Sequence, residues 1–243
     1  MNRITSFILT LTFAISIQAQ DLGLHFGHQM FGVFNSQQQI HGVSIGLDIP
    51  RSGFVTPYGQ FSMFLPYQVA ENNVGLGEPI DPMDPFLFSV DALSRTMTYS
   101  FEFGTIYYFG GAYDYGFSGM IHNSIRLMLM PTRRQLVDFD SDRYTFVPNN
   151  PNQGGLRTNG FVLNTSLGIG AKYTFDWGSL YALAGIELAL FGERLPRFYF
   201  DEFGQASPLA FSTRIGIRRD LDFSSNNERK QIRQNNRQER QRW

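Results

Sequence analysis

Apolar and polar residues alternate along eight segments of the chain, and residues 96–109 show the pattern most clearly. Every second residue from Met97 to Phe103 is apolar or aromatic, while Thr98, Ser100 and Glu102 stand between them. Because successive side chains of a strand point to opposite faces, this pattern predicts a sheet with one apolar and one polar face. A soluble sandwich buries the apolar face, whereas a transmembrane barrel turns it towards lipid and lines its lumen with the polar face.

The alternation predicts eight strands, and the phase of the first strand shifts at Met30 and Phe31, which suggests a β-bulge. The predicted strands are 22–34, 40–49, 54–65, 96–109, 116–130, 158–175, 179–191 and 209–223.

The gaps between these segments are sorted by length. The second, fourth and sixth gaps are tight turns, whereas three others are long loops at 66–95, 131–157 and 192–208. Outer-membrane barrels have short periplasmic turns and longer external loops, and a sandwich has no reason to sort its connections in this way. The sequence therefore predicts an all-β fold, an eight-stranded antiparallel up-and-down transmembrane β-barrel over residues 20–223 with both termini in the periplasm.

Composition and the N-terminal segment also favour the bacterial outer membrane. Residues 1–19 resemble a secretory signal peptide, with Arg3 ahead of an apolar stretch and Ala19 at the expected cleavage site. Beyond it, no apolar run is long enough for a spanning helix, and the absence of cysteine excludes disulfides and thiolate chemistry. The aromatic content of 15% fits a lipid-facing surface with aromatic girdles.

The predicted inward face carries charges of both signs. Eight strands leave an interior that side chains can fill, so these charges must pair with one another. We expect an ion-pair network that fills the lumen; a gated ion or proton path through the same residues, and thus a narrow channel, is the alternative. The network residues are Glu102, Arg126, Lys172, Glu187, Arg214 and Arg218.

With this alternation, loop asymmetry and inward charge, residues 21–223 resemble the small outer-membrane barrels of the OmpA-transmembrane and OmpX class and the broad outer membrane protein beta-barrel families. The resemblance is architectural and has no residue-level motif. It implies the fold and the location and says little about function. We expect no cofactor.

His122 and Ser124 form one constellation with catalytic potential, because residues at i and i+2 share a face of a strand. The pair resembles the His-x-Ser of outer-membrane lipid A deacylases, which implies Ser124 as nucleophile and His122 as base. No orienting acid is evident, although Asp138 is a candidate in a loop. The alternative is a hydrogen-bonded pair inside the lumen.

Asp138, Asp140 and Asp142 resemble the start of a calcium-binding loop, in which carboxylates at alternate positions converge on one cation. Arg143 stands where that loop needs glycine, and Asn149 where it needs glutamate. We therefore expect a solvated acidic loop and no metal site.

Two features outside the alternating segments suggest protein partners. The long loops carry aromatic residues, which either dock other proteins or fold over the lumen of their own barrel. These residues are Phe86, Phe88, Phe198, Tyr199, Phe200 and Phe203. Residues 224–243 form a polar tail with a net positive charge, which predicts disorder and either a periplasmic acidic partner or a solvated extension. Its basic residues are Arg229, Lys230, Arg233, Arg237, Arg240 and Arg242.

From these features we expect a non-enzymatic outer-membrane protein that serves as a structural or docking subunit of a cell-envelope complex, such as a secretion or barrel-assembly complex. Its partners would be outer-membrane lipid and other proteins, with no nucleic acid. The alternatives are a lipid A esterase that uses His122 and Ser124, and a narrow channel.

Overall fold

The computed structural model describes residues 21–34, 38–49, 54–83, 87–110, 116–149, 156–196, 199 and 207–222. These residues form nine strands in a single antiparallel sheet. The strands are β1 (Asp21–Val33), β2 (Gln39–Asp48), β3 (Val55–Pro79), β4 (Phe88–Phe109), β5 (Gly116–Leu136), β6 (Tyr144–Pro148), β7 (Arg157–Phe175), β8 (Gly178–Glu193) and β9 (Leu209–Asp222). No helix within the described ranges has the length and apolar character to span a membrane.

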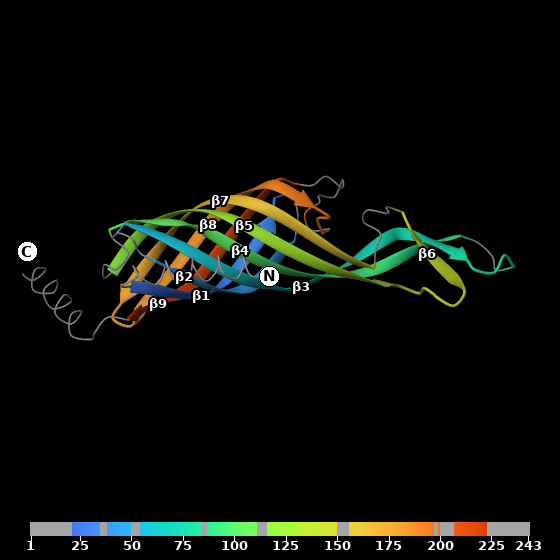
Figure 1. The fold of residues 1–243 in the computed structure, drawn as a ribbon, viewed down its shortest axis with the longest axis horizontal. Helices are drawn as coiled ribbons and strands as arrows, with labels where there is room; N and C mark the ends of the chain where they lie inside the picture. The colour runs from blue at the N-terminus through green and yellow to red at the C-terminus, as the bar shows by residue number, and fades with distance from the viewer. Residues whose placement is uncertain are drawn as a thin grey trace, which may run out of the picture.

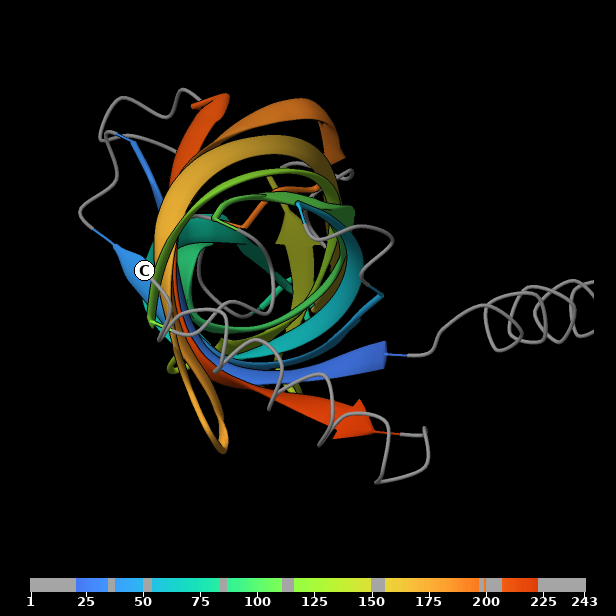
Figure 2. The same cartoon turned by 90° about the vertical axis from the view of Figure 1, so that its left-hand side faces the viewer.

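Eight of the nine described strands close into a ring, which confirms the predicted eight-stranded barrel (Figure 2). The order around the sheet is β2-β1-β9-β8-β7-β5-β4-β3, and a further pairing of β2 with β3 closes the ring. Closure satisfies the backbone hydrogen bonds between strands, which a strand in lipid requires. The ninth strand, β6, pairs with β3 outside the ring.

Exposure alternates along the ring strands, as the sequence predicts. In β2, the outward residues Val43, Ile45 and Leu47 are exposed, whereas Ser44 and Asp48, at the alternate positions of the strand, are buried inside. An exposed apolar surface on a closed ring, with polar side chains inside, is the arrangement of a barrel that spans a lipid bilayer.

The two rims of the barrel differ. The rim where β1 begins and β9 ends, which we call the terminal rim, also holds the tight turn of Asp176 and Trp177 between β7 and β8. At the opposite rim, β3, β4 and β5 continue beyond the ring and, with β6, form a long projecting sheet that we call the arm (Figure 1). The predicted sorting of connections therefore matches the topology.

The arm corrects two of the predicted loops. Residues 66–95 and 131–157 were expected to be long loops, but β3 runs on to Pro79, β4 starts at Phe88, and β5 extends to Leu136. Register shifts between Phe64 and Tyr67 and between Glu71 and Gly75 interrupt the alternation in β3, which explains why the sequence pattern is lost there.

The predicted bulge in the first strand is also wrong. β1 keeps one continuous register with both neighbours through Met30 and Phe31. The apparent change of phase has another cause: the interior becomes apolar at this level, so Phe31 and Val33 point inwards and are buried.

Candidate functional site

A buried carboxylate, Glu102 of β4, lies at the centre of a hydrogen-bonded network inside the barrel. Arg126 of β5 donates to its Oε2 from Nε at 3.0 Å and from Nη2 at 2.5 Å, and Arg214 of β9 donates to the same oxygen at 2.7 Å. Its other oxygen accepts from the hydroxyls of Tyr58 and Ser124, the latter at 3.0 Å. Five inward side chains from four strands are thus joined through one carboxylate.

Arg126 extends this network across the lumen to a second carboxylate. Its Nη1 donates to Glu187 of β8, whose other oxygen accepts from the amide of Asn164 at 3.1 Å. Glu102, Arg126 and Glu187 are completely buried. Two glutamates facing two arginines balance in charge, which offsets the large cost of burying each ion alone.

A second cluster lies nearer the terminal rim, around Asp48 of β2. Arg218 of β9 donates two hydrogen bonds to this carboxylate, from Nε to Oδ2 at 2.7 Å and from Nη2 to Oδ1 at 3.0 Å. Its Nη1 also donates to Asp220 at 2.5 Å, and Nε2 of His25 in β1 contacts Oδ2 of Asp48. Bidentate pairing of this kind fixes the relative position of β2 and β9 on either side of β1.

Lys172 of β7, the remaining residue of the predicted network, is buried with its Nζ 4.5 Å from the centre of the Tyr108 ring. This is a cation–π distance. The sequence analysis did not identify His25, Tyr58 and Asn164 as partners in these networks. Each of them occupies an inward position of its strand, so the alternation of polar and apolar residues could have placed it on the same face as the charges.

His122 and Ser124 both lie in the lumen near Oε1 of Glu102, and His122 also contacts Ser166. The Ser124 hydroxyl donates to Glu102, whereas His122 Nε2 lies 3.1 Å from the Ser166 hydroxyl and 3.6 Å from Glu102 Oε1. Asp138, the candidate third member, lies beyond β5 in the arm. The structure thus does not bring these three residues together, and it buries His122 and Ser124 on the face away from lipid.

An apolar plug fills the barrel between the ion-pair network and the rim that carries the arm. Tyr199 belongs to it: its ring centre lies 6.0 Å from that of Phe31, and its hydroxyl lies 3.5 Å from the sulfur of Met128. Of the two alternatives for Tyr199, docking of another protein and capping of its own lumen, its burial in this cluster supports the second. The plug comprises Phe31, Val33, Ile40, Phe64, Met128, Met130, Val162, Tyr199 and Ala210.

Aromatic side chains stabilise the arm at the level of β6. Phe88 packs edge-on against Tyr144 with ring centres 4.8 Å apart, and Phe139 contacts both Phe88 and Phe146. Phe88 was predicted to lie in a loop, but in the structure it is the first residue of β4. The rings lie over Gly77 and Gly75, where an added Cβ would come within 2.5 Å of Phe88 and 2.4 Å of Phe146.

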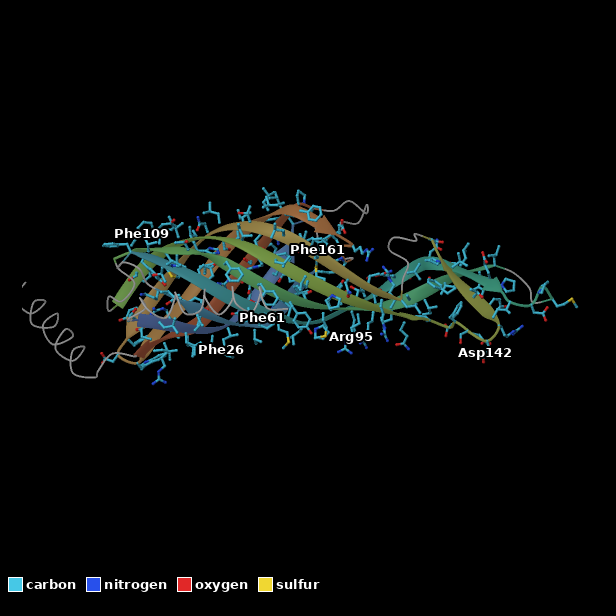
Figure 3. The ribbon with its side chains drawn as sticks, viewed as in Figure 1. Phe26, Phe61, Arg95, Phe109, Asp142 and Phe161 are labelled. Carbon is cyan, nitrogen blue, oxygen red and sulfur yellow. The ribbon has the colours of Figure 1, made fainter. Side chains whose placement is uncertain are left out.

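The acidic segment of the arm forms a turn. The backbone N–H of Asp142 donates to the Asp140 side chain at 3.0 Å, the Tyr144 N–H donates to the Asp140 carbonyl, and Asp138 has a positive φ of 50°. Among the described residues, no three His, Asp or Glu side chains form a group that could hold a metal ion. Figure 3 shows Asp142 at the far end of the arm.

Several predicted residues lie outside the described ranges. They include Phe86, Phe198, Phe200 and Phe203 of the candidate docking loops, the signal segment 1–19 and the basic tail 224–243.

Comparison with known proteins gives similarity at the level of structure. No family model matches the sequence, and no curated protein matches it. Neisserial surface protein A is 9% identical with a TM-score of 0.46, over 84% of this chain and 96% of that one. The attachment invasion locus protein Ail of Yersinia pestis is 8% identical with a TM-score of 0.44, over 84% and 100%. OprG, an outer-membrane protein of Pseudomonas aeruginosa, is 8% identical with a TM-score of 0.39, over 84% and 96%.

The features of the barrel itself identify its class of fold. The ring is closed, its outward face is apolar, and its interior holds paired charges beneath an apolar plug. The fold is that of a small eight-stranded outer-membrane β-barrel protein.

Proposed function

We propose that this protein is a non-enzymatic docking subunit of a cell-envelope complex and that the arm is the docking element. The observation that carries the proposal is the arm itself. Joining two antiparallel strands needs a loop of two to five residues, yet β3 and β4 continue as a paired sheet from Gln68–Arg95 out to Gly77–Phe88. A sheet built beyond the membrane-spanning ring indicates a role outside the ring.

The outer part of the arm exposes apolar side chains. Ile80, Met83 and Leu87 lie in the β3–β4 connection and are 58%, 91% and 59% exposed. Single exposed apolar residues are ordinary, but several within one short connection, held on an ordered sheet, are typical of a contact surface for another protein. The aromatic cluster under Phe88 supports their position, so docking would cost little conformational entropy.

The filled interior supports docking over transport or catalysis. Completely buried side chains such as Arg126 and Met128 occupy successive levels of the lumen, at a strand number that leaves little room. Ser124, the candidate esterase nucleophile, donates its hydroxyl to Glu102 inside the barrel. We further propose that the terminal rim faces the periplasm, because the chain segments that connect successive strands at this rim are short, and that the arm is therefore external.

Site-specific photo-crosslinking in the native membrane tests the proposal. A photo-reactive residue at position 83 should give a discrete crosslinked species with another envelope protein. A photo-reactive residue at Trp177, which is 56% exposed on the terminal rim, is the matched control and should give none. If positions 80, 83 and 87 all yield only uncrosslinked protein while the barrel is folded, the arm is not a docking element.

A further inference from the structure

Three arginines lie side by side on the outward face where the arm leaves the barrel. Arg95 of β4 is the direct cross-strand partner of Arg133 of β5, and Arg133 is the partner of Arg157 of β7. All three side chains are exposed. Adjacent strands are about 4.8 Å apart, so three guanidinium groups originate within about 10 Å of one another. We call these residues the arginine row.

The arginine row is electrostatically unfavourable in the protein alone. Like charges directly opposite each other on neighbouring strands destabilise a sheet. None of the three has an ion-pair partner among the described residues, in contrast to the arginines inside the barrel. Gln68 continues the row on β3, and the next outward residues along the strands are uncharged on either side. Such an arrangement is stabilised once an anion is bound.

The position of the row indicates which anion. On the same three strands, four residues nearer the terminal rim, Tyr99, Leu129 and Phe161 form a register row of apolar and aromatic outward side chains. Four residues of strand correspond to about 13 Å. The arginine row thus lies about 13 Å beyond an apolar row of the outward surface, where we expect acyl chains to give way to headgroups. Figure 3 shows Arg95 pointing away from the ribbon at the base of the arm.

We propose that Arg95, Arg133 and Arg157 bind the phosphate groups of a membrane lipid whose acyl chains lie against Leu129 and Phe161. The guanidinium fork matches the geometry of phosphate oxygens, and three adjacent forks suit a headgroup that carries more than one phosphate. A free phosphate ion would bind the same three arginines but would make no contact with the apolar row of Tyr99, Leu129 and Phe161. The lipid is therefore the ligand that uses both features.

The test uses the full-length protein in a neutral detergent, titrated with bis-phosphorylated lipid A and followed by native mass spectrometry. Arg133→Gln, at the middle of the row, should weaken lipid binding about tenfold, in line with the loss of charge-assisted hydrogen bonds. Arg133→Lys keeps the charge and should recover part of the affinity. Arg219→Gln removes an exposed outward arginine near the terminal rim and should leave binding within about twofold, since it lies far from the row.

Three results would overturn the proposal. Equal binding by the wild-type protein and Arg133→Gln would exclude the row as the site. Equal loss in Arg219→Gln would show attraction by overall charge. Displacement of the phosphorylated lipid by inorganic phosphate at comparable concentration would assign the row to free phosphate, because the acyl chains would then add nothing to the affinity. Because the Arg133 side chain faces outwards and has no ion-pair partner in the part of the chain that the structure describes, its variants should fold, and heat-modifiable migration on gels verifies this for each.

Discussion

Glu102 and Arg126 are direct cross-strand partners on β4 and β5, and their side chains meet in the centre of the barrel through two hydrogen bonds of 3.0 and 2.5 Å. The same carboxylate also accepts from Arg214, a residue more than one hundred positions away in sequence, at 2.7 Å. This contact joins the middle of the chain to its last described strand, so it stabilises the closed ring as well as one strand pair.

Glu102→Gln should therefore destabilise the whole barrel. The variant removes the negative charge that both arginines share, leaving them under-compensated, and removing one partner of a buried pair costs about 3–5 kcal/mol. The free energy of unfolding in urea, measured in lipid or detergent, checks this. Glu78→Gln, in the exposed outer part of β3, is the matched control and should change stability by less than about 0.5 kcal/mol. Equal values for both variants would mean that the network contributes little.

Ser124→Ala separates the structural role of this hydroxyl from a catalytic one. Loss of its hydrogen bond to the Glu102 carboxylate should lower stability by about 1.5–3 kcal/mol. We expect the lipid A mass spectrum of cells that express the variant to match that of wild-type cells. A lost or added acyl chain that depends on Ser124 would instead support the esterase hypothesis.

Tyr199→Ala should loosen the apolar plug. Truncation removes ring contacts with Phe31 and with the sulfur of Met128, and losses of this kind in a core cost about 3–5 kcal/mol. Planar-bilayer recordings address the same residue, because we expect no conductance steps from the wild-type protein. Steps in the wild-type protein that Tyr199→Ala enlarges would support the narrow-channel alternative.

Gly77→Val should disorder the outer arm and spare the ring. The new side chain would occupy the place of the Phe88 ring, which would lie 2.5 Å from its Cβ. Hydrogen exchange should rise at residues 75–80 and 144–148 and stay unchanged in β1 and β9, and crosslinking from position 83 should be lost. Gly59→Ala is the control, since its Cβ would be 3.4 Å from Phe103, an ordinary contact. Crosslinking that survives Gly77→Val would show that docking does not need the ordered arm.

The ends of the strands at the terminal rim could be predicted closely from sequence. The tight turn at Asp176 and Trp177 and the start of β5 at Gly116 lie where the alternation places them. At this rim, lipid on one side and a polar lumen on the other impose a strict period of two, so the loss of that period marks the ends of the strands there. The inward position of each network charge follows from the same parity.

The predictions from sequence were wrong where the two faces of a strand differ little in polarity. Phe31 and Val33 break the alternation in β1 because the upper lumen is apolar, so the two faces no longer differ in polarity. In the arm, strand residues such as Leu76 and Ser89 meet water, and bulges shift the register, so residues 66–95 lack a periodic pattern although most of them form strands.

The sequence by itself determined the eight-stranded barrel and which charged residues face inwards, because both follow from period-two alternation between lipid and lumen. Only the tertiary structure decided which inward charges pair, that Tyr199 closes its own lumen, and that Arg95, Arg133 and Arg157 lie in one row. These relationships depend on the register between strands and on contacts between residues far apart in the chain, which alternation within one strand does not encode.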